Sequence, residues 1–337
     1  MQGPPPASQA LVTAGGPPYL PQSAGLGGIP TVSVDVPICS VFVAIFLVAA
    51  VSHMRLFRLN LSRGHKFIPS AVTFGFCVAR TVANVLRIAW ATHTTNFRLA
   101  IAAQVLVAAG VILLFILNLL YAQRMLRASW PRLGWSRGGS YLFKALYILI
   151  GITLIMVIVA TVQSFYTLNA NTRRIDRNLQ LYGGSYTTFI SFLPLPILVF
   201  LFLTPRPGQP QPGESFGAGS WGAKGVIVGA ASVLLTLGAG FRLGIAAMPP
   251  RPLSHPAWYH HKVCFYIFNF SLEAIVVYLY LLGRVDQRFF VPDGSSKVRS
   301  YSVEDGRSKE EGSSSSSKAV QGEKGEGQVV EAAVESK

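Results

Sequence analysis

The sequence predicts an all-α integral membrane protein in which seven transmembrane helices form one bundle. The chain of 337 residues is 51% hydrophobic and only 13% charged, which is about half the charged fraction of a soluble domain. Its apolar residues form blocks of about 20 residues, the length that spans a hydrocarbon core about 30 Å thick at about 1.5 Å per residue. Most of the basic residues lie in the short loops between these blocks.

The apolar blocks define the expected helices and leave one polar segment at each end of the chain. Residues 1–34 contain no charged side chain and are rich in Pro and Gly, which is typical of a disordered arm. Residues 35–284 form the membrane domain. Residues 285–337 are rich in Ser, Gly, Glu and Lys and predict a disordered cytoplasmic tail. The expected spans are 35–54, 68–91, 99–121, 144–165, 186–204, 225–247 and 263–283.

Two blocks contain residues that are unusual in a membrane helix. The second contains Arg80 and Arg87, and the fifth contains Pro194 and Pro196. Proline removes a backbone donor, and a membrane helix tolerates it where neighbouring groups satisfy the freed carbonyl. We therefore expect the fifth helix to be kinked.

The distribution of Lys and Arg predicts that the N-terminus is outside and the C-terminus is in the cytoplasm, because basic residues accumulate in cytoplasmic loops. In this orientation fifteen basic residues are cytoplasmic and six are outside. The cytoplasmic set is Arg55, Arg58, Arg63, Lys66, Arg124, Arg127, Arg132, Arg137, Lys144, Arg206, Lys224, Arg284, Arg288, Lys297 and Arg299. The outer set is Arg98, Arg173, Arg174, Arg177, Arg251 and Lys262. We expect the plasma membrane rather than an internal membrane to hold the chain.

One face of the second block is polar along its length. Residues at steps of three and four share one face of a helix. A charged side chain at a helix centre costs about 2.5–3.5 kcal/mol on insertion scales, so this face is expected to point into the bundle. The stripe consists of Thr73, Cys77, Arg80, Asn84 and Arg87.

Arg80 is expected to pair with an acid across the middle of the bundle. Counted at 1.5 Å per residue from the inner ends of their helices, Arg80 and Glu273 lie at similar depths, about 18 and about 15 Å. Glu273 is taken as the only acid inside an apolar block. The pair would be either a static lock between helices or a switch, since a buried ion pair alone is weak evidence of stability.

A second polar group is expected in the outer half of the bundle, about 20–30 Å from the inner surface. It consists of Asn84, Arg87, Gln104, Gln163, Arg242, Tyr266 and Asn269. Two arginines with amide and phenol neighbours, and with no acid in a block at that depth, favour an anionic guest such as a lipid phosphate or a carboxylate. The alternative is that Arg87 and Arg242 only extend to the outer interface. Together with Arg80, these residues are the candidate ligand-binding set.

Several functional classes lack the residues that they require. The last block has no Lys for a Schiff base, and the three histidines between residues 255 and 261 lie in or beside an outer loop. No Gly-x-Ser-x-Gly motif or pair of intramembrane acids indicates hydrolysis. We expect no catalytic residue, no cofactor and no metal.

The basic residues do not form a stripe on a polar surface, so the net charge of +15 does not predict binding to nucleic acid. Cys39, Cys77 and Cys264 are expected as free thiols, with a bridge between Cys39 and Cys264 as the alternative.

Several segments resemble a family of uncharacterised fungal seven-helix membrane proteins, over about residues 68–295. They are RIAWATHTTNFRLAIAAQVLVAAGVILLF, VQSFYTLNANTRRIDRNLQLYGGSY, ESFGAGSWGAK, PAWYHHKVCFYIFNFSLE and RVDQRFFVPDGS. Members of that family often carry the label of family C-like G-protein-coupled receptors. GAGFRLG, which contains Arg242, and CFYIFNFSLE, which contains Glu273, are more distantly similar to the fungal lipid-translocating exporter-like family. The resemblance to both families implies seven membrane helices.

The sequence favours a non-enzymatic, receptor-like protein that senses a small or lipidic anionic ligand from the outer side. The basic inner loops and the Ser-rich tail would then contact a cytoplasmic signalling partner. Ser302 follows Arg299 by three residues and is a candidate phosphorylation site, with a plain solvated tail as the alternative. The basic loops also suit contact with anionic membrane lipids, at about 1 kcal/mol per Lys or Arg. There are two alternative functions. One is a lipid transporter in which Arg80, Arg87 and Arg242 bind a lipid headgroup in succession, and the other is a structural scaffold.

Overall fold

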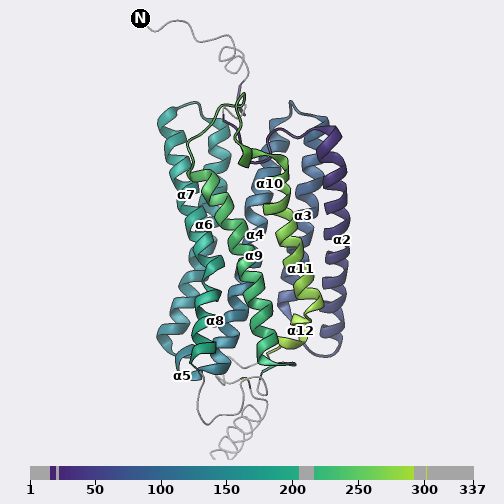
Figure 1. Cartoon of the computed structure of the whole chain (residues 1–337), viewed down its shortest axis with the longest axis vertical. Coiled ribbons are helices and arrows are strands. Elements are labelled where there is room, and N and C mark those ends of the chain that lie inside the picture. Colours follow the sequence, from purple (N-terminus) through teal and green to yellow (C-terminus); the bar gives the residue numbers. More distant parts are fainter. Residues whose placement is uncertain (1–15, 20–22, 205–215, 292–300, 302–337) are drawn as a thin grey trace, which may run out of the picture.

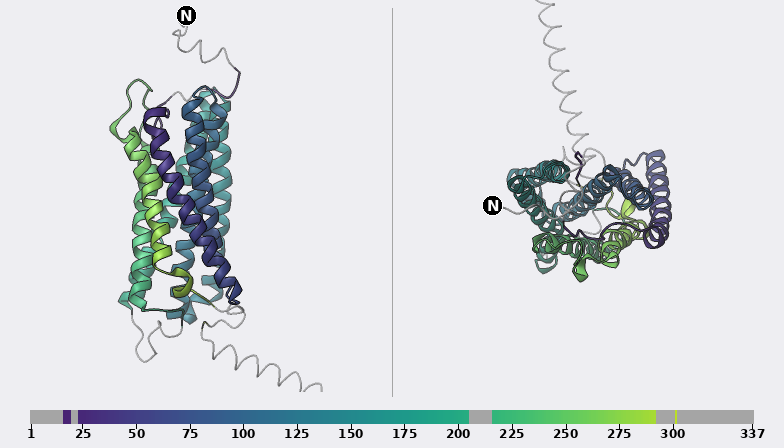
Figure 2. Two further views of the ribbon diagram at one scale, coloured as in Figure 1. Left: turned by 90° about the vertical axis from the view of Figure 1, so that its right-hand side faces the viewer. Right: turned by 90° about the horizontal axis from the view of Figure 1, so that it is seen from above.

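The computed structural model describes residues 16–19, 23–204, 216–291 and 301. Helices make up almost all of the regular structure of these residues, and they run side by side along the long axis of the molecule (Figures 1 and 2). The elements are α2 (Val32–Ser62), α3 (Ile68–Thr92), α4 (Phe97–Ser129), α5 (Pro131–Gly134), α6 (Arg137–Tyr166), α7 (Ala170–Phe192), α8 (Pro194–Leu203), α9 (Trp221–Ala247), η1 (Trp258–His260), α10 (Lys262–Tyr266), η2 (Ile267–Ser271), α11 (Leu272–Leu282) and α12 (Val285–Arg288).

Seven helical stretches of the described residues are long and apolar enough to cross a membrane, which confirms the predicted class. They are α2, α3, α4, α6, α7 with α8, α9, and the segment from α10 to α11. Several extend well past the apolar block that predicted them. α2 has 31 residues and α4 has 33, whereas about 20 suffice to cross the hydrocarbon core. The extra turns are polar and carry many of the basic residues that were expected in loops.

The fifth span begins much earlier than the block at 186–204 predicted. α7 starts at Ala170, so Arg173, Arg174 and Arg177 lie in its first turns and not in a loop. Asn169 begins the helix by accepting a hydrogen bond from the Asn171 amide at 2.9 Å, as a capping residue does. The helix then breaks between Phe192 and Pro194, where α8 begins. The interruption lies at the prolines, as the sequence predicted.

The seventh span contains one turn of π-helix. α10 ends at Tyr266, η2 covers Ile267–Ser271 with π geometry, and α11 continues from Leu272. A π-turn adds a residue to the helical path and leaves a local irregularity in the backbone bonding. No feature of the apolar pattern had predicted this turn, and it lies next to Glu273.

The spans pack in two groups, which α4 and α11 join. α2 packs on α3 and α3 on α4, while α7 packs on both α6 and α9. α11 contacts both α2 and α9, and α4 contacts α6, α7, α8 and α9. The inner half of α4 is therefore in the core, with Leu114, Tyr121 and Met125 fully buried. Its outer half differs, because residues 104–109 are all exposed or half-buried.

An N-terminal segment closes part of the outer end of the bundle. We call residues 23–30 the outer cap. Its Ala24 amide donates to the Arg251 carbonyl at 2.8 Å, and its Gly27 amide donates to the His260 carbonyl at 3.0 Å. Gly27 has a φ of +79°, and a Cβ there would lie 2.6 Å from the Phe265 ring. Only glycine combines this backbone conformation with so close an approach.

Candidate functional site

Arg80 of α3 and Glu273 of α11 meet in the interior of the bundle. Arg80 Nε lies 2.5 Å from Glu273 Oε2, and Arg80 Nη2 lies 2.8 Å from Glu273 Oε1. The Arg80 side chain is fully buried and that of Glu273 is 2% exposed. This is the pair expected from the depths of the two residues, and its two-pronged form is the strongest that arginine and a carboxylate can make.

The rest of the Arg80 guanidinium is also satisfied. Its Nη1 donates to the carbonyls of Leu106 and Val107 in α4, at 3.1 and 3.0 Å. Gly110, one turn further along α4, leaves room for the group, since a Cβ there would lie 3.2 Å from Nη1. All five residues of the polar stripe of α3 are buried, as predicted. Arg80 therefore ties α3, α4 and α11 together at one point.

A second arginine approaches the same carboxylate from α9. Arg242 Nη1 lies 3.8 Å from Glu273 Oε1. The same nitrogen donates to the Phe268 carbonyl and to Asn269 Oδ1, both at 3.3 Å. Both acceptors belong to the π-turn, which places them toward α9. We call Arg80, Glu273 and Arg242 the central triad.

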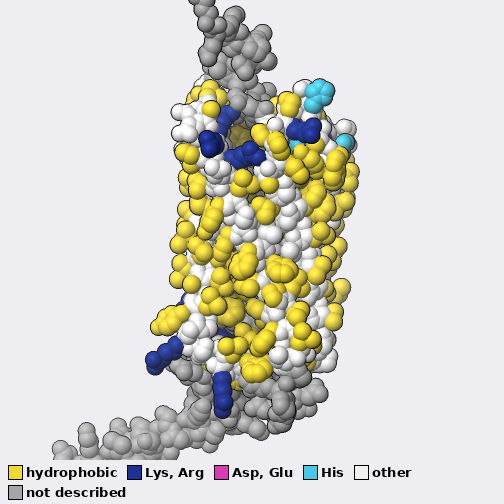
Figure 3. All heavy atoms as spheres, turned by 60° about the vertical axis from the view of Figure 1, so that its left-hand side comes forward, with side chains coloured by type: hydrophobic (Ala, Val, Ile, Leu, Met, Phe, Trp, Pro, Cys, Tyr) yellow, Lys and Arg dark blue, Asp and Glu magenta, His cyan; other side chains and the backbone are white. Residues whose placement is uncertain are grey.

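Arg242 differs from Arg80 in its exposure. Its side chain is 24% exposed, whereas that of Arg80 is fully buried. A crevice that is too narrow to hold a water molecule lies between α4, α9 and the seventh span beside Arg242 and Glu273, and Val111, Leu235 and Leu272 contribute to its apolar wall. The outer end of the molecule is hollowed between groups of Lys and Arg side chains (Figure 3). By its exposure, Arg242 is the partly accessible arginine of the triad.

The outer half of the bundle contains a buried acid. Asp35, in the first turn of α2, is fully buried. Its Oδ1 lies 2.8 Å from Arg87 Nη2 and accepts a hydrogen bond from Tyr266 Oη at 2.6 Å. Its Oδ2 lies 2.5 Å from Lys262 Nζ. The expectation of two arginines with no acid at that depth is therefore wrong for Arg87.

Arg87 is also held by the outer cap. Its Nη2 donates to the Gly27 carbonyl at 2.9 Å, and its guanidinium lies 4.1 Å from the centre of the Phe265 ring. Arg87 is therefore buried among these partners and does not lie open to a guest, so the interpretation of Arg87 as a free anion-binding residue is wrong. We call Asp35, Arg87, Lys262 and Tyr266 the outer network. The network joins α2, α3 and α10 beneath the cap.

The expected polar group is thus divided between two places. Arg242 and Asn269 join the central triad, whereas Arg87 and Tyr266 join the outer network. Gln104 and Gln163 are exposed and contribute to neither. Asn84 is buried between them and donates to the Arg80 carbonyl at 2.8 Å.

The cysteines and Asp176 also lie in the described part of the chain. The described cysteines are free, and Cys39 Sγ lies 3.2 Å from Tyr266 Oη and not against Cys264. Asp176 of α7 is 2% exposed, and its Oδ2 has no hydrogen-bond partner among the described residues. It lay outside the predicted block, so its burial was not expected. Ser302 and the tail beyond it lie outside the described residues.

Comparison with known proteins gives one match, over part of the chain. Residues 221–290 match a family described as a protein of unknown function, DUF3112. This segment runs from the start of α9 to just past α12, so it contains Arg242, the π-turn and Glu273. No curated protein and no solved structure matches the chain. The structure and this match describe a multi-pass membrane protein whose central triad is drawn mainly from the matched segment.

Proposed function

We propose that this membrane protein senses an anionic small or lipidic ligand from its outer side and that Arg242 is the residue that binds it. The observation that carries the proposal is the charge of the central triad. Arg80 and Arg242 share one carboxylate, Glu273, so the triad has a net charge of +1 with both arginines ionised. A bound anion would neutralise that excess.

The high free energy of an uncompensated charge inside a bilayer supports the proposal that the triad binds an anion. A charge in the bilayer interior is costly, and proteins retain one mainly where it serves a substrate, an ion or a ligand. Arg80 is fully buried, and four of its five N–H groups already donate to Glu273 and to two carbonyls. Arg242 uses only Nη1 for hydrogen bonds to described residues. Its remaining donors suit a carboxylate or a phosphate, which arginine binds with two parallel hydrogen bonds.

The same geometry supports a receptor-like response. Arg242 contacts the π-turn and Glu273 together, at distances of 3.3–3.8 Å. An anion that draws Arg242 away would weaken both contacts and leave Glu273 to Arg80 alone. Since α9 and α11 pack on each other, their relative position would respond to the ligand. A ligand shifts such an equilibrium only by its different affinity for the two states.

The alternative function is a lipid transporter with a ladder of three arginines. A ladder requires cations that are free to pass a headgroup from one to the next. Arg80 and Arg87 are both held by buried carboxylates at 2.5–2.8 Å. Only Arg242 is partly open, so the geometry favours a sensor with a single binding cation.

Ligand-dependent stabilisation of the purified protein tests the binding step. The probes are hexanoate and a short-chain phosphatidate, with a short-chain phosphatidylcholine as the neutral comparison. We expect the anionic probes to raise the unfolding midpoint of the wild-type protein and of Arg98→Gln, an exposed outer arginine of the same charge. Arg242→Gln should lose the response. An equal response in both variants would remove Arg242 from the site, and lipid flux in reconstituted vesicles that Arg242→Gln abolishes would favour the transporter.

A further inference from the structure

The face of α2 that points away from the bundle core changes from apolar to basic near its inner end. Residues at steps of three and four share one face of a helix. On this face Val48 and Val51 are exposed apolar residues, and Arg55 and Arg58 follow within two turns. About 20 residues of helix cross the hydrocarbon core. Val51 is the twentieth residue of α2, so the change occurs where the core ends.

A groove of about 530 Å³ lies at this position between α2 and α3. Val51, Met54 and Leu59 of α2 and Phe74 of α3 supply its apolar lining. Arg55, Arg58 and Ser62 supply its polar lining. The groove therefore has an apolar part at the depth of acyl chains and a basic part at the depth of headgroups.

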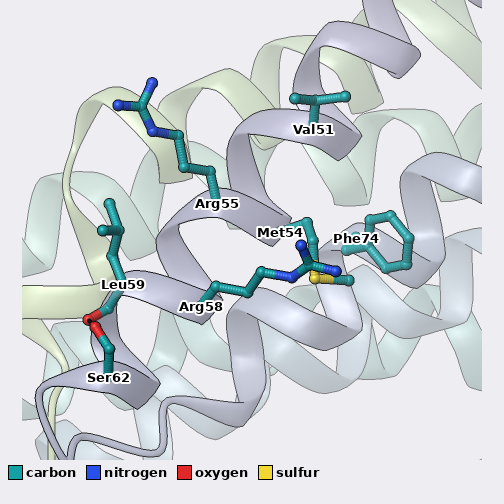
Figure 4. Close-up of a pocket in the computed structure, with 7 residues that line it drawn as sticks. All are labelled: Val51, Met54, Arg55, Arg58, Leu59, Ser62 and Phe74. Carbon is teal, nitrogen blue, oxygen red and sulfur yellow. Dashed lines mark hydrogen bonds between the residues drawn. The ribbon is translucent and has the colours of Figure 1, made fainter.

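The two arginines of the groove are not neutralised within the protein. Both are exposed, and neither makes an ion pair or a hydrogen bond to a described residue. Figure 4 shows their side chains diverging from successive turns of α2. Arg58 extends toward Met54 and Phe74, and Arg55 extends to the other side. Arg58 thus lies across the groove and Arg55 at its edge.

We propose that this groove binds one anionic glycerophospholipid of the inner leaflet, with the phosphate against Arg58, an acyl chain along Val51 and Phe74, and Arg55 contributing its charge from the edge of the groove. Charge complementarity identifies the occupant, because two unpaired guanidinium groups favour an anionic phosphate. The apolar lining continues from those groups toward the membrane interior, where an acyl chain lies and an acidic peptide would not reach. This site is separate from the central triad and does not depend on the function proposed for Arg242.

The affinity of the site should depend on both parts of the groove. A basic residue near an anionic membrane surface contributes about 1 kcal/mol, so removing two should weaken binding by roughly 30-fold. Arg58 lies across the groove, so its removal should weaken binding more than removal of Arg55. Added salt should reduce the preference for anionic lipid, because the headgroup contact is near the aqueous surface.

Native mass spectrometry of the full-length protein in detergent tests the proposal. The protein is titrated with palmitoyl-oleoyl phosphatidylserine and with the matching phosphatidylcholine. We expect the wild-type protein to retain one phosphatidylserine in preference to phosphatidylcholine. The double variant Arg55→Gln/Arg58→Gln should lose that preference by roughly 30-fold. The matched control, Arg132→Gln/Arg137→Gln, removes two exposed arginines from elsewhere on the inner end and should keep it.

Two further variants separate the groove from a general charge effect. Val51→Trp keeps both arginines and fills the apolar part, so it should displace the lipid. Arg242→Gln alters the outer-side site and should leave phosphatidylserine retention unchanged. Equal losses in the Arg55→Gln/Arg58→Gln variant and in its control would overturn the proposal. Retention that is unaffected by Val51→Trp, or displacement of the lipid by an acidic peptide, would also overturn it.

Discussion

Glu273 is the residue on which the interior of the bundle depends. A buried ion pair contributes little to stability when it is intact, but removal of one partner leaves a buried charge uncompensated. Glu273 faces two arginines, so its loss is more serious than the loss of either one. Arg80 also donates to two α4 carbonyls, those of Leu106 and Val107.

Glu273→Gln is therefore expected to be the most destabilising neutral substitution of the central triad. It leaves two guanidinium groups without a counter-charge, and loss of one partner of a buried pair costs about 3–5 kcal/mol. Arg80→Gln should cost less, because Arg242 still compensates Glu273. The double change should recover part of the sum of the single losses. The measurement is the free energy of unfolding in mixed micelles, and strictly additive losses would show that the two side chains do not interact energetically.

The sequence predicts some of these contacts better than others. Depth along a helix follows from the rise per residue, so the approach of Arg80 to Glu273 could be expected from their positions alone. Asp35 lies at the edge of its apolar block, where hydropathy does not mark it as an intramembrane acid, so the sequence does not predict its pairing with Arg87 and Lys262. An apolar block ends where hydropathy falls. The helix continues past that point, and some of the polar residues beyond it are still buried in the bundle.

At the scale of elements, hydropathy predicts how many spans there are but not where each begins or what its backbone does. α7 starts 16 residues before its predicted block, because its first turns carry arginines and amides that give no apolar signal. The π-turn of the seventh span is stabilised by contacts with another helix, such as that between Arg242 and the Phe268 carbonyl. Contacts between segments that are distant in the sequence produce no periodic pattern of residues, so the π-turn could not be predicted from the sequence.

The outer cap offers a matched pair of glycines for a test at this scale. Gly27 and Gly28 both have positive φ, but a Cβ on Gly27 would meet the Phe265 ring, whereas Gly28 has open space around it. Gly27→Ala should therefore loosen the cap through the clash, and Gly28→Ala should add only the backbone strain common to both. We expect amide exchange across residues 23–30 to be about tenfold faster in Gly27→Ala than in Gly28→Ala, equivalent to about 1.4 kcal/mol of local stability. Equal exchange in the two variants would mean that the Phe265 contact does not hold the cap.

The attachment of the cap is also expected to depend on pH through His260. Burial lowers the pKa of His260 below its ordinary value, and nearby Arg251 lowers it further. The neutral ring accepts a hydrogen bond from the Ala257 amide at Nδ1, and protonation of that nitrogen removes the acceptor. Since the folded pKa is lowered, the unfolded chain binds more protons below the ordinary imidazole pKa of about 6.5.

Stability at this site should therefore be full above that pKa and should fall as the pH decreases below it toward the lowered pKa of the folded protein. Amide exchange at Gly27, which donates to the His260 carbonyl, provides the measurement after correction for the intrinsic pH dependence of exchange. His260→Gln removes the titrating group and should abolish the pH dependence. A profile that is the same in the wild-type protein and in the variant would assign the effect to another group.

At the scale of the whole molecule, an odd number of spans places the two ends of the bundle domain on opposite sides. The outer cap lies at one end of the long axis and α12 at the other (Figure 1). Each end is also held together by its own set of hydrogen bonds. At the end that carries α12, the Ala218 amide donates to the Gln287 carbonyl at 2.9 Å, and Arg124 donates to the Phe289 carbonyl at 2.5 Å. The two ends are therefore built differently and are suited to different surroundings.

The distribution of the basic residues predicts the orientation of this asymmetric bundle. Among the described residues of the two sets, twelve lie on the side of α12 and six on the side of the cap, and the side richer in Lys and Arg is expected to stay in the cytoplasm. An epitope tag before Met1 should be accessible on intact cells, whereas one after Lys337 should become accessible only after permeabilisation. The inverse pattern would place Arg242 on the cytoplasmic side and the α2 groove in the outer leaflet. Access to both tags from the same side would mean that one of the seven helices does not cross the bilayer, and the shared depth that brings Arg80 to Glu273 would then need another cause.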